Sequence, residues 1–583
     1  MRRTKIVCTI GPASEQTELL EKMLLAGMDV ARLNFSHGSH ADHSRRVHAV
    51  RTACLNTGAN IAVLLDTKGP EIRLGYLEQE PVELLPGAEV RITTCDVKGN
   101  EKLLPVTYKD LPRDVRTGNR ILIADGLIAL QVKQVEECEI LCVVENGGKL
   151  TSQKGVNVPG VRINLPALTD KDKEDILFGI EHDFDFVAVS FVRKAGDVLA
   201  IRRIIEENNG HMDIIAKIEN QEAVENLDEI IKVSDGIMVA RGDLGVEIPP
   251  EEVPIIQKAI IERCNLAGKP VITATQMLES MVQNPRPTRA EASDVANAIL
   301  DGTDAVMLSG ETAAGKYPVA AVQTMARIAV RAEAALAYDE LLRSKRRAIS
   351  RTITDAISHA TVTTALDLGA AAIITSTESG YTAKMVSKYR PKATIIAVTP
   401  HKNVLRKMAL VWGTQPLLVE RTKDTDSMIA AAVDVSLQSK LIKGGDLIVI
   451  TAGVPVGVHG TTNLIKVQTV GDIVAHGTGI GSRAVTGKAC VAADGRQAAE
   501  KISRGDILVT GDTDREFIPA IEKAGAIITE MGGLTSHAAI VGLEFGIPVV
   551  VGVAGATSII PDGEVITVDG QRGLVYRGSA RVL

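Results

Sequence analysis

Charged and hydroxyl side chains stand at the ends of short apolar segments in the first 310 residues of this chain. In the segment VARLNFS, Arg32, Asn34 and Ser36 occupy alternate positions and would share one face of a strand. Lys217 and Glu219 alternate in the same way in AKIEN. The remaining polar residues at segment ends are Asp66, Thr67, Asp243 and Thr275.

This mixture of residue types suits phosphoryl transfer assisted by a divalent metal ion. Glu219 and Asp243 are expected on neighbouring strands about 5 Å apart. Mg²⁺ typically takes one or two protein carboxylates and leaves its other positions to water and substrate oxygens. Arg32, Arg73 and Lys217 are cations for an anionic substrate, and phosphoryl transfer depends on positioning and charge neutralisation. The alternative is that each side chain makes only a structural hydrogen bond or ion pair.

Eight short apolar segments would position these residues, and most are followed by a helix-like stretch. Apolar strands that alternate with helices indicate a parallel sheet covered by helices, and eight such units predict a closed (β/α)₈ TIM barrel. An open doubly wound sheet is the alternative. The expected strands are residues 4–10, 30–35, 61–66, 186–191, 213–219, 236–241, 271–275 and 305–309.

One long insertion and two further segments complete the predicted organisation, which is of the α/β class. The insertion is rich in short strands and turns, and its place after the third strand puts it over the C-terminal face of the barrel as a lid. The predicted domains are the barrel (1–69 and 170–339), an inserted all-β lid (70–169), an α/β domain (340–473) and a small swivelling β/α domain (474–583).

Composition excludes several classes of protein. A net charge of −7 and 3% aromatic residues argue against nucleic-acid binding, which needs a basic surface or stacking platforms. Seven scattered cysteines form neither a metal-ligand pattern nor a disulfide framework. No apolar run reaches the ~18 residues of a membrane span. We expect a cytoplasmic protein that binds neither nucleic acid nor membrane.

Seven strings resemble the signature of the pyruvate kinase family and occur in that family's order. The resemblance extends over residues 1–473 and implies the barrel, the lid and the α/β domain. The strings are ARLNFSHG, LDTKGPEIR, AKIEN, MVARGDLGVE, TATQMLESM, PTRAEASDVANA and MLSGETAAGKYP.

The resemblance implies transfer of the phosphoryl group of phosphoenolpyruvate to ADP, which gives pyruvate and ATP, by a homotetramer. Arg32 and Lys217 would face the substrate phosphate, and Thr275 would help to protonate the enolate. The backbone around Gly242, next to Asp243, would hold the substrate carboxylate. The other implied roles are Mg²⁺ (or Mn²⁺) ligation by Glu219 and Asp243, K⁺ ligation by Asn34, Ser36, Asp66 and Thr67 near Glu71, and nucleotide contacts from Arg73, Lys154, His37 and Asn34.

The string TESGYTA matches the loop that binds a phosphorylated effector in the family. Thr377, Ser379 and Thr382 would hold the phosphate before a helix N-terminus. A simple helix cap is the alternative. Glu378 and Tyr381 differ from the basic residues of members regulated by fructose 1,6-bisphosphate. The resemblance therefore leaves the identity of the effector open.

The last segment, with GGLTSHAAIVGLEFGIPVVVG, resembles the phosphohistidine domain of phosphoenolpyruvate synthases and pyruvate phosphate dikinases. His537 stands at the phosphorylated position, whereas Leu543 replaces an arginine that is usual there. No ATP-grasp domain is found in the sequence. A retained fold without phosphotransfer and an active phosphohistidine are equally open for this domain. Two alternatives for the whole chain are disfavoured. A synthase-like phosphotransferase lacks its ATP-grasp domain here, and an inactive regulatory protein would not need the complete set Arg32, Lys217, Glu219, Asp243 and Thr275.

Overall fold

Eight parallel strands close into a barrel in the strand order β1-β16-β15-β14-β13-β12-β3-β2. This confirms the predicted barrel and excludes the open sheet. The structure is a computed structural model that describes residues 1–345, 352–422, 424–454, 462–471 and 473–580. The barrel strands are β1 (Lys5–Thr9), β2 (Val30–Asn34), β3 (Ala62–Asp66), β12 (Phe186–Val189), β13 (Asp213–Ile218), β14 (Gly236–Ala240), β15 (Val271–Ala274) and β16 (Ala305–Leu308).

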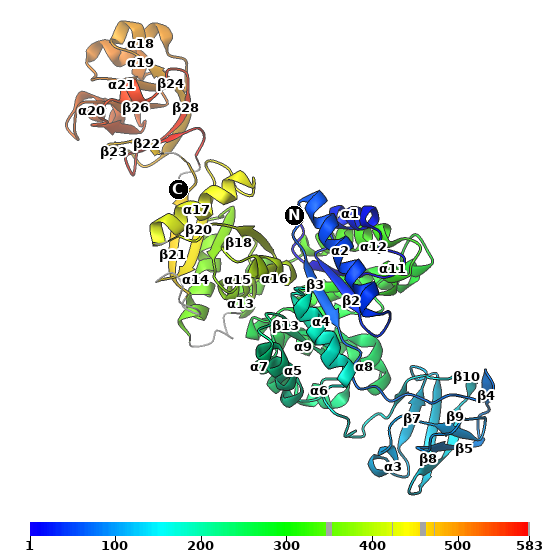
Figure 1. Cartoon of the computed structure of the whole chain (residues 1–583). Helices are drawn as coiled ribbons and strands as arrows, with labels where there is room; N and C mark the ends of the chain where they lie inside the picture. Colours follow the sequence, from blue (N-terminus) through cyan, green and yellow to red (C-terminus); the bar gives the residue numbers. More distant parts are fainter. Residues whose placement is uncertain (346–351, 423, 455–461, 472, 581–583) are drawn as a thin grey trace. The chain divides into compact units, whose positions relative to one another are not determined.

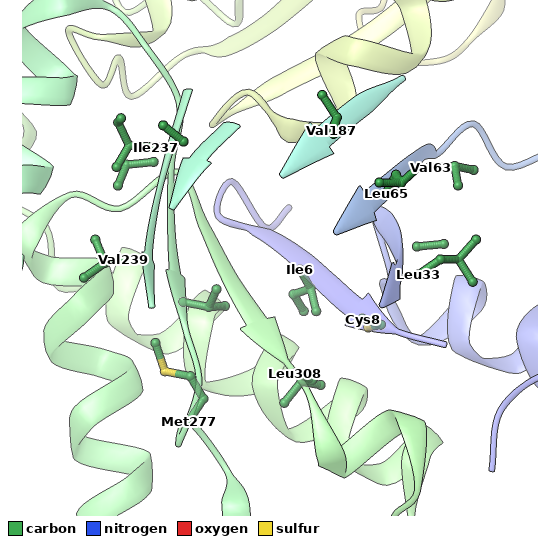
Figure 2. Close-up of a cluster of buried hydrophobic side chains, with 14 of the residues drawn as sticks. Ile6, Cys8, Leu33, Val63, Leu65, Val187, Ile237, Val239, Met277 and Leu308 are labelled. Carbon is green, nitrogen blue, oxygen red and sulfur yellow. The ribbon is translucent and has the colours of Figure 1, made fainter. Parts of the chain in front are cut away.

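Alternate residues of each barrel strand pack into two separate apolar layers. Side chains of one parity, such as Val30, Leu64 and Ile215, fill the barrel interior. Side chains of the other parity, such as Ile6 and Val63, pack between the strands and the surrounding helices; Figure 2 shows part of this layer. Which alternate residues face the barrel interior matters for function, because the last of them on each strand reach the mouth of the barrel.

Helices follow the strands and cover the outside of the barrel (Figure 1). Several have the start signals that sequence predicts: Ser39, Thr169 and Thr288 each form a capping box at a helix N-terminus. The helices are α1 (Thr17–Ala26), α2 (His40–Thr57), α4 (Asp170–Glu181), α5 (Ala195–Glu207), α6 (Gln221–Glu225), α7 (Leu227–Val233), α8 (Arg241–Glu247), α9 (Val253–Ala267), η1 (Glu279–Val282), α10 (Arg289–Asp301), α11 (Gly310–Ala313), α12 (Pro318–Glu333) and α13 (Tyr338–Lys345).

The insertion after β3 is almost entirely β and has an apolar core of its own, as predicted. A six-stranded sheet runs in the order β11-β7-β8-β9-β5-β6, and β10 pairs with β4. The elements are β4 (Val82–Leu84), β5 (Glu89–Thr93), β6 (Leu103–Pro105), α3 (Leu111–Asp114), β7 (Arg120–Ile123), β8 (Ile128–Val135), β9 (Glu139–Asn146), β10 (Gly148–Leu150) and β11 (Val156–Asn157).

A five-stranded sheet in the order β19-β18-β17-β20-β21 follows the barrel. The four strands other than β21 are joined by helices, which agrees with the predicted α/β character. Its elements are α14 (Ile353–Asp367), β17 (Ala372–Ser376), α15 (Tyr381–Ser387), β18 (Thr394–Thr399), α16 (Lys402–Lys407), η3 (Met408–Leu410), β19 (Thr414–Leu418), α17 (Thr425–Gln438), β20 (Leu447–Gly453) and β21 (Thr462–Thr469).

The C-terminal segment forms an eight-stranded sheet in the order β22-β29-β28-β24-β25-β26-β27-β23, with two apolar cores. Its elements are β22 (Ile473–His476), β23 (Thr478–Ile480), β24 (Ala484–Val491), α18 (Gly495–Lys501), β25 (Ile507–Thr510), η4 (Arg515–Phe517), α19 (Ile518–Ile521), β26 (Ala526–Thr529), α20 (His537–Phe545), β27 (Val549–Val551), α21 (Ala556–Ile559), β28 (Val565–Asp569) and β29 (Leu574–Arg577).

The described residues fall into two compact units. One is drawn from Met1–Ala348, Ala383–Arg390 and His401–Pro416, and the other from Ile349–Thr382, Pro391–Pro400 and Leu417–Leu583. The finer boundaries at residues 70, 170, 340 and 474 stay a prediction. All seven cysteines are free, as expected. None of the helices in the described ranges is long and apolar enough to span a membrane.

Candidate active site

Polar side chains replace apolar ones at the C-terminal end of the barrel interior. Arg32 follows Val30 on the interior face of β2, and Lys217 follows Ile215 on β13. The pairing of β2 with β3 places Asn34 directly beside Asp66. The alternation seen in the sequence therefore brings these residues to one mouth of one barrel.

Asp66 joins the two buried cations of this cluster. Its Oδ2 accepts a hydrogen bond from Arg32 Nε at 2.7 Å, and its Oδ1 accepts one from Lys217 Nζ at 3.2 Å. Lys217 Nζ also lies 2.8 Å from Glu219 Oε1 and donates to Ser190 Oγ at 2.7 Å. All five side chains are buried. Ser190, one residue beyond β12, was missed in the sequence analysis.

Burial and charge act in opposite directions on this network. Burial would raise the pKa of the Asp66 carboxyl, but the Arg32 and Lys217 cations hold it below its usual value. Burial disfavours the Lys217 ammonium, whereas the charges of Asp66 and Glu219 raise its pKa above the usual value. Lys217 is therefore a fixed cation at physiological pH.

The two carboxylates proposed for a metal ion repel each other. Burial raises the pKa of Glu219 and of Asp243; Lys217 opposes the rise at both, and the charge of Asp243 adds to the rise at Glu219. Glu219 Oε2 accepts a hydrogen bond from the backbone amide of Phe191 at 2.6 Å. Asp243 lies in α8 and not on β14 itself, so the expectation that both carboxylates stand on neighbouring strands was wrong in this detail.

Thr275 has a left-handed backbone conformation, with φ of 65°, just beyond β15. The Gly242 amide donates to its Oγ1 at 2.8 Å, which brings these two predicted residues together. Arg241 donates to the Thr275 carbonyl at 2.7 Å and forms a two-pronged ion pair with Asp294 at 2.9 and 2.7 Å. The motifs ARGD and EASDVAN contain this pair, but its contact across the fold is not evident from sequence.

The oxygen-rich residues predicted for a monovalent cation lie on the β2 and β3 side of the mouth. Ser36 is in the turn after β2. The expectation that it shares one strand face with Arg32 and Asn34 was therefore wrong. Its amide donates to Asn34 Oδ1 at 3.0 Å. Thr67 Oγ1 accepts from the Ser190 amide at 3.2 Å, and its carbonyl accepts from Ser190 Oγ at 2.7 Å.

A cavity of about 280 Å³ opens between the inserted β region and the barrel. It is lined by Asp243, Glu71 and Asp125, together with residues of β11 and α6. Within the described ranges, no group of three or more His, Cys, Asp and Glu side chains is arranged to hold a metal ion.

The residues predicted to contact the nucleotide are not gathered in this cavity. Arg73 lies 2.7 Å from Glu71 and donates to the Gln153 carbonyl at 2.9 Å. His37 and Lys154 are exposed, and neither lines the cavity.

Two predicted sites lie in the other compact unit. Thr377 Oγ1 accepts from the Gly380 amide at 2.9 Å, and Thr382 is 2.8 Å from the Thr462 hydroxyl, while Ser379 is exposed. His537 is the first residue of α20, and its Nδ1 lies 3.1 Å from Thr513 Oγ1.

Known proteins match this chain over nearly its whole length. Family models match residues 1–322 (pyruvate kinase, barrel domain), 355–468 (pyruvate kinase, alpha/beta domain) and 502–573 (PEP-utilising enzyme, mobile domain). A pyruvate kinase from Geobacillus stearothermophilus is 57% identical over 585 residues and covers 100% of both chains. One from Bacillus licheniformis is 55% identical over 586 residues, with the same coverage. A crystal structure of a pyruvate kinase from Cryptosporidium parvum has a TM-score of 0.77 at 42% identity, over 80% of this chain and 96% of that chain.

Proposed function

The chain belongs to the pyruvate kinase family and transfers the phosphoryl group of phosphoenolpyruvate to ADP, and from that premise we propose that the buried polar cluster at the barrel mouth carries the reaction. The observation that supports this most is the position of Lys217, a buried cation among Asp66, Glu219 and Ser190. The decisive experiment is a coupled assay with phosphoenolpyruvate, ADP, Mg²⁺ and K⁺ on folded variants of this cluster.

The substrate phosphate would lie against Arg32 and Lys217. Both cations are held by carboxylates in the structure, so they are fixed in place before the substrate arrives. Preorganised charge of this kind needs no reorganisation when charge develops. The reaction then consists of transfer to ADP followed by protonation of the enolate, with the Thr275 hydroxyl placed beside the Gly242 amide.

The donor set fits a divalent cation. Glu219 and Asp243 are two buried carboxylates with raised pKa values, and a Mg²⁺ or Mn²⁺ ion between them would offset their repulsion. When bound, such an ion would neutralise charge on the substrate oxygens. Glu219 is already oriented by the Phe191 amide and by Lys217.

The residues beside Arg32 fit a monovalent cation. Asn34 and Asp66 stand opposite each other on β2 and β3; Thr67 follows Asp66 directly, and Ser36 is two residues after Asn34. These are hard oxygen donors, and Glu71, whose carboxylate pairs with Arg73, follows in the chain after β3. The cation would supply positive charge beside the substrate phosphate.

We expect activity to require K⁺. Turnover should fall at least about tenfold when K⁺ is replaced by tetramethylammonium, because the oxygen donors lose their counter-charge. Glu71→Lys should relieve the requirement by placing an ammonium group near the same place. The measurement is turnover against K⁺ concentration at constant ionic strength, and full wild-type activity without K⁺ or Na⁺ would contradict the assignment.

The nucleotide phosphates would be contacted by Arg73, Lys154 and His37, with Asn34 nearby. All lie on the inserted β region or on the loop after β2, so the insertion would act as a lid. For Arg73 to contact a nucleotide phosphate, closure of the inserted β region would have to release Arg73 from its ion pair with Glu71.

A phosphorylated effector would bind at Thr377, Ser379 and Thr382. The Gly380 amide donates to the Thr377 hydroxyl just before α15, so a bound phosphate would have to take over this amide or share it. A homotetramer located in the cytoplasm completes the proposal.

We expect residues 474–583 to be dispensable for catalysis, because the proposed catalytic set ends at Thr275. A truncation ending near Val470 should keep turnover within about twofold, and so should His537→Ala. The measurement is turnover of phosphoenolpyruvate and ADP, with thermal unfolding as the check on folding.

The opposite result for His537 would change the mechanism. A neutral imidazole is a competent phosphoryl acceptor, and Thr513 fixes one of its two nitrogens. If folded His537→Ala lost most turnover, phosphotransfer through this histidine would replace the direct mechanism.

A further inference from the structure

The first turn of α4 contacts both loops that carry the proposed monovalent-cation ligands. This helix begins directly after the chain returns from the inserted β region, and a capping box between Thr169 and Asp172 fixes its start. Its neighbours are the loop after β2, which begins at Phe35 and contains Ser36, and the loop after β3, which contains Thr67. No step of the reaction described above uses α4.

Lys171 attaches α4 to the loop after β2. Its ammonium donates to the Phe35 carbonyl at 3.0 Å, and Phe35 lies between Asn34 and Ser36 in the chain. The same ammonium pairs with Asp175 at 2.6 Å. The Asp175 side chain is fully buried, so its charge needs partners in the folded state.

Asp175 has a second partner, His40, which stands where the loop after β2 meets α2. Its Oδ1 lies 2.6 Å from His40 Nε2 at the start of α2. The Phe35 ring stacks on His43, with ring centroids 3.9 Å apart, and meets the edge of Phe178 of α4 at 5.6 Å. The loop after β2 is thus held by α4 through the Phe35 carbonyl and the Phe35 ring, and the start of α2 is held through the contact between His40 and Asp175.

Asp172 attaches α4 to the loop after β3. Its Oδ1 accepts from the Gly69 amide at 2.9 Å, and its Oδ2 is engaged by Thr169. Gly69 has φ of +72°, and a Cβ there would meet Phe191 at 2.8 Å and Ser190 at 2.9 Å. A side chain does not fit at this position, so the chain passes close to Ser190 and Phe191, and Asp172 holds its amide.

We propose that Lys171, Asp172 and Asp175 are positioning residues of the monovalent-cation site and set its affinity. The inference rests on the proposed function of Asn34, Ser36, Asp66 and Thr67. A singly charged ion binds only where several oxygens are held at suitable spacing, and oxygens on two separate loops keep that spacing only if the loops are tied together. The first turn of α4 is such a tie.

The experiment compares Lys171→Met with Lys173→Met. Lys173 is on the same helix, half exposed, and pairs with Asp170 at the surface, so its loss should change nothing. Lys171→Met should raise the K⁺ concentration for half-maximal activity about tenfold, since a charged hydrogen bond to the loop is lost. Turnover should recover at saturating K⁺, and the KM for phosphoenolpyruvate measured there should change little.

A second readout does not depend on turnover. The Tm of the full-length protein should rise with K⁺ against a tetramethylammonium control, and Lys171→Met should shift the midpoint of that rise by the same factor. In a Glu71→Lys background, the effect of Lys171→Met on cation response should disappear. Asp175→Asn keeps the shape of the side chain and should also raise the K⁺ midpoint. It replaces Lys171→Met in the experiment if that variant does not fold.

The outcomes separate this inference from the cation site itself. If the wild type responds to K⁺ in neither activity nor Tm, the proposed site and its positioning residues both fail. If the wild type responds and the folded Lys171 and Asp175 variants have its K⁺ midpoint, only the positioning role fails.

Discussion

Lys217→Met should lower turnover at saturating substrates by at least about 100-fold, equivalent to about 2.7 kcal/mol of transition-state stabilisation. The ammonium is buried, held by Asp66, Glu219 and Ser190, and its pKa is raised, so it is charged at every working pH. A fixed cation is most valuable where negative charge develops, here on the enolate oxygen. We therefore expect the loss in kcat and not in the KM for phosphoenolpyruvate.

The measurement is steady-state kinetics at saturating Mg²⁺ and K⁺, with thermal unfolding in parallel. Removal of Lys217 leaves Glu219 without its cation and Asp66 with Arg32 alone. This costs stability, so the Tm shows whether the variant is folded under assay conditions. Ser190→Ala is the matched control: it removes a partner of the same ammonium but leaves its charge, and should cost less than tenfold. A folded Lys217→Met enzyme that kept kcat and lost only affinity would indicate ground-state binding.

The barrel could be predicted because its signals are local. Every strand is a short apolar run, and the interior parity that ends in Arg32 and Lys217 is visible as simple alternation. The strand pairing that puts Asn34 beside Asp66 follows from barrel closure once eight βα units are counted. The sequence did not predict the local conformation just beyond the strand ends, where Ser36 lies in a turn and Asp243 lies in a helix.

The supporting contacts could not be predicted, because they join residues far apart in the sequence. Ser190 follows β12 and contacts Lys217 because β12 lies next to β13 in the barrel. Arg241 and Asp294 are likewise far apart in the sequence but form an ion pair in the fold. Lys171 contacts a carbonyl oxygen, a group that every residue carries and that leaves no trace in side-chain type. Sequence patterns identify side chains that perform chemistry more readily than those that hold them.

Glu219→Gln and Asp243→Asn should each raise the Mg²⁺ concentration for half-maximal activity by at least about 30-fold, or about 2 kcal/mol. Mg²⁺ prefers anionic oxygen, and an amide keeps the shape of the side chain but loses the charge. Glu219 and Asp243 both interact with the Lys217 cation near this cavity. Loss of either charge should therefore weaken the binding of the ion.

Both substitutions should leave the fold intact or stabilise it slightly without metal, because each removes one of two buried carboxylates that repel each other. Glu247→Gln is the matched control: it lies on α8 with Asp243, but its carboxylate accepts from Asn157 at 2.8 Å. That variant should keep the wild-type Mg²⁺ midpoint. The measurement is turnover against Mg²⁺ concentration at fixed K⁺ and substrates, and a Glu219→Gln or Asp243→Asn enzyme with wild-type turnover at limiting Mg²⁺ would remove that carboxylate from the metal site.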